Sequence, residues 1–383
     1  MKDQPIATHQ ETLDLEDIEL DPEENTEEDQ NEPDMVNPFD PNEIDIIPQA
    51  EVLYSIIDRL KHQEIDMNPD FQRHPNLWDN KKMSRFIESI LIRFPVPAFY
   101  FDASDENKWL VVDGLQRLSS IIRFVIDKNL RLMGLEYLTY YNGCTYEDLK
   151  RIHKRRIESC PLTLFLIRPG TPDAVKYSIF RRINTGGLVL NDQEIRNAMT
   201  TPKIRECLEK LAKNASLKNA IGDQSKRMVD QEWVLRYLAF RFMDYEENKK
   251  NITNFLDEMN KMMETADDRS LELYSQSFEV AIARCWEIFG KHAFEKTKEG
   301  KHDRKRRKSS TLFETWMNAL SKVSAEDMEK LQDRKESIVQ KHLDLMAEDN
   351  DYFNSITFST QKKDHYRTRK SKIETLIQGV LHD

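Results

Sequence analysis

One short segment combines four side chains that could act together on a phosphate. Residues 109–117 read WLVVDGLQR, so a carboxylate, a glycine, an amide and a guanidinium fall within five positions. Asp113 could hold a Mg2+ ion, a ribose hydroxyl or an attacking water, and Gln116 could position that water or read a base. Gly114 permits a tight turn, while Arg117 could grip phosphate oxygens with two donors. The segment predicts an anion-binding turn suited to a nucleoside phosphate.

A structural interpretation of the same residues also stands. Asp113 could cap the following helix and pair with Arg117 four positions on, an arrangement worth about 0.3–0.5 kcal/mol on a surface. Under this interpretation the turn holds the fold and binds nothing.

A second candidate is the pair Gln72 and Arg73, which follows the turn-rich Asn68-Pro69. A loop arginine there could reach across to the same anion. The alternative is an ordinary solvated or structural pair.

A third candidate spans residues 180–196, which read FRRINTGGLVLNDQEIR. Consecutive backbone amides around two glycines can form a nest for an anion. The spacing of Asn191 and Glu194 resembles a capping box for the next helix, so a helix stop followed by a helix start is the alternative. The nest would be formed by Asn184, Thr185, Gly186 and Gly187.

Common metal and nucleotide motifs are absent from the sequence. There is no GxxxxGK[ST] phosphate loop and no GxGxxG fingerprint, which argues against the commoner nucleotide-binding folds. The nine histidines are scattered, without a close pair suited to a metal. Cysteines in paired spacing would indicate zinc or disulfides, but the four here lie far apart and are expected to be small core residues: Cys144, Cys160, Cys207 and Cys285.

The elements that position the first two candidates form an α/β pattern. Apolar residues at a spacing of four predict a helix over residues 51–61, and Asp79 can cap a second helix that Pro95 ends. Short runs of aromatic and β-branched residues predict strands at 98–101, 109–112 and 162–167. Helical spacing returns after Gly114 and around residues 174–183.

Beyond residue 201 the strand signals fade, and long helical patterns follow at residues 231–243, 255–263, 277–289 and 312–320. The expected fold class is therefore α+β, with a small α/β domain at residues 49–200 and a helical domain at 201–383.

Charge separates the opening segment from the rest of the chain. Residues 1–48 carry seventeen Asp or Glu and one Lys, a net charge of -16, which leaves about +5 for residues 49–383 because the total is -11. With few aromatics, the segment is expected to be a disordered tail. The role of such a tail is either that of a solubilising extension or that of a mimic of nucleic-acid charge that occludes a basic face.

No signal peptide and no apolar run of about 18 residues is present, so a soluble cytoplasmic protein without membrane contact is expected.

The three candidate segments together resemble the ParB/sulfiredoxin-like nucleoside triphosphatases typified by the S half of the GmrSD type IV restriction enzymes. That family's motifs are F-Q-R after a proline-rich loop, ESIL before a P-x-P, D-G-Q-Q-R, and F-x-R-I-N-T-G-G with a later E-I-R. The chain carries them in order at residues 69–73, 88–97, 113–117 and 180–196. Weaker likeness continues at residues 255–257, 289–294 and 313–314.

The resemblance implies a fold like the ParB N-terminal domain, with Asp113, Gln116 and Arg117 at a bound nucleoside triphosphate and Gln72-Arg73 beside it. It also implies that nucleotide binding or hydrolysis, with Mg2+, controls a nuclease that attacks modified or invading DNA.

Two departures from the family qualify this picture. Leu115 stands where the motif has a polar residue, so the role of that side chain is lost, although Leu115 stays among the expected nucleotide-binding residues. Fused relatives carry an HNH nuclease with paired histidines, which this sequence lacks. The chain therefore resembles the sensor or motor half alone, with a separate HNH-type nuclease as partner.

The sequence leaves three candidate functions for the chain. The first is an NTPase of a restriction or anti-phage defence system that licenses a partner nuclease. The second is a DNA-binding or partner-recruiting protein without turnover, which would use the basic runs at 301–308 and 362–372, unless these are solvated loops. The third, a nuclease, lacks metal-holding clusters. The expected nucleic-acid contacts are Lys305, Arg306 and Arg307.

Overall fold

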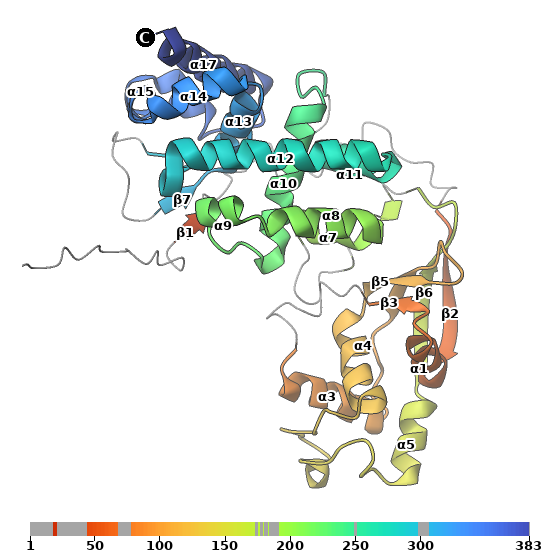
Figure 1. Cartoon of the computed structure of the whole chain (residues 1–383). Coiled ribbons are helices and arrows are strands. Elements are labelled where there is room, and N and C mark those ends of the chain that lie inside the picture. The colour runs from red at the N-terminus through yellow and green to blue at the C-terminus, as the bar shows by residue number, and fades with distance from the viewer. Residues whose placement is uncertain are drawn as a thin grey trace, which may run out of the picture. The chain divides into compact units, whose positions relative to one another are not determined.

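The computed structural model describes residues 18–20, 44–67, 78–172, 175, 176, 179, 183, 191–248, 251–297 and 306–382 (Figure 1). The chain divides into two compact units, one of residues 35–191 and one of residues 1–34 with 192–383. The first contains a sheet with helices, and the second is helical apart from a two-stranded sheet. The expected order, an α/β region followed by a mainly helical region, is confirmed.

A five-stranded mixed sheet organises the first unit, in the order β2-β6-β4-β5-β3. Strand β6 is antiparallel to β2 and parallel to β4, while β5 is antiparallel to β4 and parallel to β3. The three strands expected from sequence are confirmed as β4, β5 and β6. The strands are β2 (Ile46–Val52), β3 (Ile65–Asp66), β4 (Phe99–Asp102), β5 (Trp109–Asp113) and β6 (Pro161–Ile167).

Strand β2 was not expected and corrects two boundaries. The first helix, α1 (Leu53–Lys61), begins after Val52 rather than at residue 51, and the segment expected to be a tail ends before Ile46. Pro48 interrupts the apolar pattern of this strand, and β2 tolerates it because β2 lies at the edge of the sheet, where a missing N–H is not needed.

The helix that precedes β4 in the chain and the helix that follows β5 supply the core of this unit. The second expected helix is α3 (Asn80–Leu91), and its predicted cap is confirmed because the Asp79 carboxylate accepts a 2.7 Å bond from the Lys82 amide. The helix after β5 is α4 (Leu115–Ile121), which continues into a π-helical turn at Ile122–Ile126. Fully buried side chains of these helices share one hydrophobic core with the rings of Phe99 and Phe101: Ile87, Leu91, Leu118, Ile121 and Phe124.

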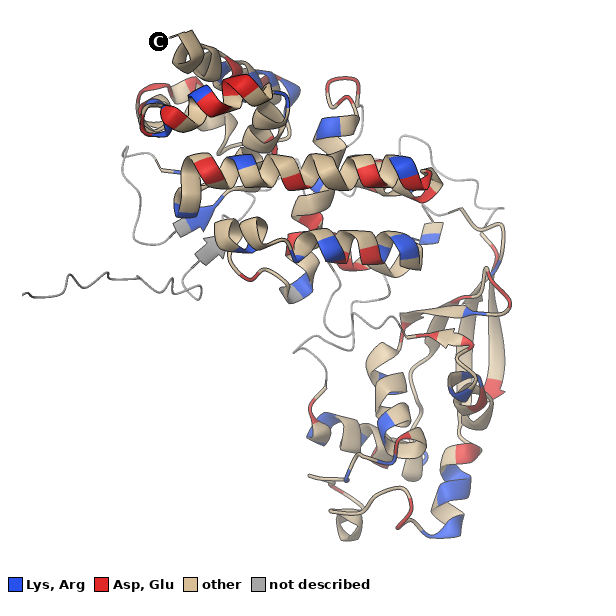
Figure 2. Ribbon diagram, viewed as in Figure 1, with Lys and Arg blue, Asp and Glu red and all other residues tan. Residues whose placement is uncertain are grey.

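Helix α5 (Arg151–Glu158) was not expected, because its sequence RIHKRRIE contains only two apolar residues. It contacts α1 and α3, and its Lys and Arg side chains make it visibly basic (Figure 2).

The buried Glu88 of α3 ties an irregular segment to this core. Its carboxylate accepts bonds of 2.7–2.9 Å from the backbone amides of Glu136, Tyr137 and Leu138. Burial opposes ionisation of Glu88, but the three amides prevail and lower its pKa below the ordinary value. Glu88 of the ESIL motif therefore has a structural role.

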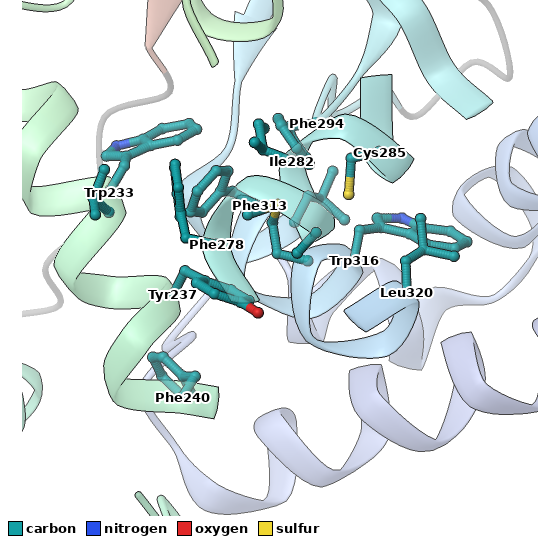
Figure 3. Close-up of a cluster of buried hydrophobic side chains, with 14 of the residues drawn as sticks. Trp233, Tyr237, Phe240, Phe278, Ile282, Cys285, Phe294, Phe313, Trp316 and Leu320 are labelled. Atoms are coloured by element: carbon teal, nitrogen blue, oxygen red, sulfur yellow. The ribbon is translucent and has the colours of Figure 1, made fainter. Parts of the chain in front are cut away.

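The second unit is built from helices, and all four long helical patterns are confirmed as α10–α13. Rings and aliphatic side chains of α10, α12 and α13, such as Trp233, Phe278 and Trp316, interdigitate in one core (Figure 3). The helices are α7 (Asp192–Met199), α8 (Pro202–Ala212), α9 (Ala215–Ile221), α10 (Val229–Phe242), α11 (Ile252–Thr265), α12 (Asp268–Phe289), α13 (Ser310–Ser321), α14 (Ala325–Asp333), α15 (Lys335–Glu348), α16 (Asn350–Ser355) and α17 (Lys363–His382).

Helix α7 follows directly after Asn191, where a helix start was expected, and it belongs to the second compact unit. The fully buried Arg196 explains this, since it donates a 2.6 Å bond to Asp257 of α11. Glu194 is also held in this unit, by an ion pair of 2.9 Å with Arg227.

A short strand from the acidic opening segment also lies in the second unit. Strand β1 (Ile18–Leu20) pairs in parallel with β7 (Arg306–Lys308), and Glu19 stands opposite Arg307. Part of the segment expected to be disordered is thus a strand, while residues 1–17 and 21–43 lie outside the described residues.

All four cysteines are free. Cys160 and Cys285 are buried, as expected for core residues, and burial raises the pKa of both thiols, whereas Cys144 and Cys207 are half-buried. No helix in the described ranges has the length and apolarity needed to cross a membrane.

Candidate functional site

The turn between β5 and α4 is built around a glycine that no other residue could replace without strain. Gly114 has φ 108° and ψ 6°, in the left-handed region. A Cβ added there would lie closer than 3 Å to two atoms of the Phe99 ring. Gly114 therefore serves both the turn and the close approach of the backbone to β4.

Arg117 is held by four partners, one at the turn and three at the start of β4. Its guanidinium donates to the Asp113 carboxylate at 2.7 Å, to the Pro97 carbonyl at 2.5 Å and to the Ala98 carbonyl at 3.1 Å. It also stacks on Phe99, with 4.4 Å between guanidinium carbon and ring centroid. Burial lowers the pKa of Arg117, and the neighbouring carboxylate opposes the shift. Its geometry makes Arg117 a clamp between the two strands β4 and β5.

Asp113 lies at an irregularity of the sheet. The register of β4 and β5 shifts there, so Asp113 rather than Val112 stands opposite Tyr100. Such bulges re-aim side chains beside functional sites. The pairing of Asp113 with Arg117 foreseen in the structural interpretation is present, but the cap is not, because the helix N-cap is Gly114 and no side chain caps it. The Asp113 side chain remains 30% exposed and can still meet a ligand.

Gln116 joins this turn to the chain segment that precedes α3. Its Oε1 accepts a 2.9 Å hydrogen bond from the backbone amide of Trp78. The chain leaves β3 parallel to β5, hence toward Gly114, and it is next described at Trp78, beside Gln116. Both described ends of the intervening segment therefore point to the β5–α4 turn.

Several candidate residues lie outside the described residues. These are Gln72, Arg73, Asn184, Thr185, Gly186, Gly187 and Lys305.

The described residues 175, 176, 179 and 183 have helical backbone, in agreement with the expected helix at 174–183. Lys176 pairs with Asp102 at 2.9 Å and donates to the Ser104 hydroxyl at 2.7 Å. These partners lie at and just beyond the end of β4. Because β4 and β5 are antiparallel, this is the opposite end of the strands from Gly114.

The described residues of the basic run at 301–308 lie in different environments. Only the backbone of Arg306 is described, Arg307 is exposed, and Lys308 is fully buried. The Lys308 ammonium donates to the carbonyls of Lys291 and Ala293 and pairs with Glu295. Lys308 therefore anchors β7 and does not contribute to a basic surface.

The run at 362–372 is helical, so its interpretation as a loop is wrong, and it is partly neutralised. Arg369 is 1% exposed and pairs at 2.6 Å with Glu314, which also pairs at 2.5 Å with Arg236. Lys372 pairs with Asp349 at 2.5 Å. Charges bound in this way are poor contacts for nucleic acid.

The residues that sequence reasoning missed are those that hold the turn. Phe99 and Tyr100 were expected only as part of the strand at 98–101, and no role was expected for Trp78. The position of Phe99 in the strand before the one that ends at Gly114 could have indicated its role. The register shift that brings Phe99 close to Gly114, however, cannot be predicted from the alternation of apolar and polar residues alone.

Among the described residues there is no group of three or more His, Cys, Asp or Glu that could hold a metal by itself. Asp113 offers one carboxylate, which fits Mg2+ only where substrate phosphates and water complete the coordination.

Comparison with known families gives one match. Residues 53–201 match the family model described as GmrSD restriction endonuclease, N-terminal domain. Neither the curated proteins nor the solved structures contain a significant match to this chain. The matched range contains the β5–α4 turn, with Asp113 to Arg117, and the Trp78–Gln116 contact.

Proposed function

Residues 53–201 are a GmrSD restriction endonuclease N-terminal domain, and from this premise we propose that the chain is the nucleotide-hydrolysing component of a restriction or anti-phage defence system. Its substrate is a nucleoside triphosphate with Mg2+, and its hydrolysis licenses a separate nuclease, of HNH type, that cleaves modified or invading DNA.

The observation that carries the proposal is the 2.9 Å bond between the Trp78 amide and Gln116. Since β3 also runs toward Gly114, the described chain before Gln72 and Arg73 leads toward the turn, and the described chain after them begins at the turn with Trp78. A cation from that segment can then meet phosphates held at the turn.

The arrangement supports a division of roles. Asp113, partly exposed beside a bulge, orients the attacking water or a Mg2+ ion held mainly by the phosphates. Gln116 keeps its amide nitrogen to direct toward the ligand, because its oxygen accepts from Trp78. Arg117 positions Asp113, and Arg73 takes the role of offsetting phosphate charge. Main-chain groups at Gly114 and Leu115 line the phosphates.

The test is phosphate release from ATP, GTP, CTP and UTP by the purified full chain, with and without DNA. Asp113→Asn should abolish turnover while keeping a polar partner for Arg117. Asp58→Asn on α1, an exposed carboxylate, is the matched control and should leave turnover unchanged. Absence of turnover with all four nucleotides contradicts the proposal.

A second candidate, nucleic-acid binding without turnover, draws on the β1–β7 pair. A strand from the segment of net charge -16 lies against the basic strand that contains the exposed Arg307. This is the arrangement expected if the acidic segment mimics nucleic acid. Duplex binding that weakens with salt and ignores nucleotide would favour this candidate.

A further inference from the structure

Three neighbouring strands bring an aromatic pair beside the β5–α4 turn. Tyr100 of β4 stands opposite Asp113 of β5 on one side and Phe165 of β6 on the other. The rings of Tyr100 and Phe165 are stacked, with centroids 4.8 Å apart and an angle of 13° between their planes. We call these two residues the aromatic pair.

The aromatic pair lies outside the core of its unit. Phe99 and Phe101, which flank Tyr100 in β4, are fully buried and belong to the hydrophobic core, whereas both members of the aromatic pair are half-buried and do not. Alternation along β4 therefore directs Tyr100 to the face opposite the core. The far end of β4 on this face is occupied by the ion pair of Asp102 with Lys176.

We propose that the aromatic pair stacks the base of the nucleotide whose phosphates bind at the β5–α4 turn. This inference rests on the proposed function and deepens it, because it makes the ligand a nucleotide rather than a polyphosphate alone. Cα atoms of residues paired across antiparallel strands lie about 4.5–5.5 Å apart, so the Tyr100 ring is within one nucleotide length of Asp113. Aromatic faces stack on every base, which predicts modest selectivity among the four nucleotides.

The experiment compares two ligands by titration calorimetry on the full chain: a nucleoside triphosphate, tried as ATP, GTP, CTP and UTP, and inorganic tripolyphosphate. Tyr100→Leu should weaken nucleotide binding by about tenfold or more, the range for loss of one stacking partner. Tripolyphosphate binding should not change, because it has no base. Tyr100→Phe keeps the ring and should retain nucleotide affinity. Tyr54→Leu removes an exposed tyrosine from α1 and is the matched control.

Phe165→Leu removes the other ring of the pair, from β6. It provides a second test of the inference if the Tyr100→Leu variant does not fold. An unchanged nucleotide affinity in folded Tyr100→Leu overturns the inference and leaves the proposed function standing. Equal weakening of nucleotide and tripolyphosphate also overturns it, since the ring would then act only through the turn. A wild-type chain that binds none of the four nucleotides overturns both.

Discussion

Arg117 stacks its guanidinium on the ring of Phe99, 4.4 Å from guanidinium carbon to ring centroid, and the same ring lies beneath Gly114. Strand β4 thus supports the turn after β5 through the side chain of Phe99. The sequence predicted that Arg117 binds phosphate. The structure instead supports a role in which Arg117 positions the Asp113 carboxylate.

Replacing Arg117 should destabilise the first unit. Arg117→Ala removes three hydrogen bonds from a side chain that is only 10% exposed, and we expect a loss of about 2–3 kcal/mol in the free energy of unfolding. Arg117→Lys keeps the charge but not the planar fork, so it should recover only part of this loss. Urea unfolding measures both, and a wild-type midpoint in Arg117→Ala would contradict the clamp.

Replacing Gly114 tests the contact with Phe99. Gly114→Ala should cost about 1–2 kcal/mol for the left-handed backbone and about 1–3 kcal/mol more for overlap with the ring. Gly143→Ala is the matched control, because Gly143 also has positive φ, 87°, but a Cβ there would meet nothing within 4 Å. Thermal unfolding should show the larger loss for Gly114→Ala, and equal losses would refute the overlap.

Low pH should lower the stability of the first unit, because Glu88 then becomes protonated. Its folded-state pKa is lowered, so its contribution to stability is present above the unfolded pKa of about 4.3 and is lost as pH falls through the folded pKa. Glu88→Gln should therefore be less stable than wild type at pH 7, with a difference that shrinks below pH 4. Glu106→Gln, at an exposed position of the same unit, should show no such pH-dependent difference. The measurement is the urea midpoint across pH 3–7.

The acidic segment should compete with nucleic acid if it covers β7. Deleting residues 1–34 should then raise affinity for a DNA duplex, and Glu19→Lys, which places like charges opposite Arg307, should do so in part. Fluorescence anisotropy at several salt concentrations measures this. If the deletion leaves affinity unchanged at low salt, the mimicry interpretation is wrong.

The strongly periodic elements could be predicted from the sequence, whereas the elements and contacts that depend on long-range packing could not. Residues 312–320 lie in a helix whose apolar positions recur with the helical period, so α13 was expected close to its true bounds. Helix α5 was missed because its stability comes from packing of few apolar residues, such as the buried Ile157.

The same limit applies to the site. The types and spacing of Asp113, Gly114, Gln116 and Arg117 predicted a turn after a strand, and the structure has it. The partners Phe99 and Trp78 lie 15–40 residues away along the chain, and their contacts depend on strand order and on a one-residue bulge, which no local pattern encodes.

The two outer strands of the sheet have a consequence for how this protein behaves at high concentration. Strand β2 carries Pro48, and β3 is only two residues long, so neither outer strand offers a long row of open backbone groups to a neighbouring molecule. The addition of a strand from another molecule, the usual route from a mixed sheet to fibrils, is therefore disfavoured at both edges of the sheet.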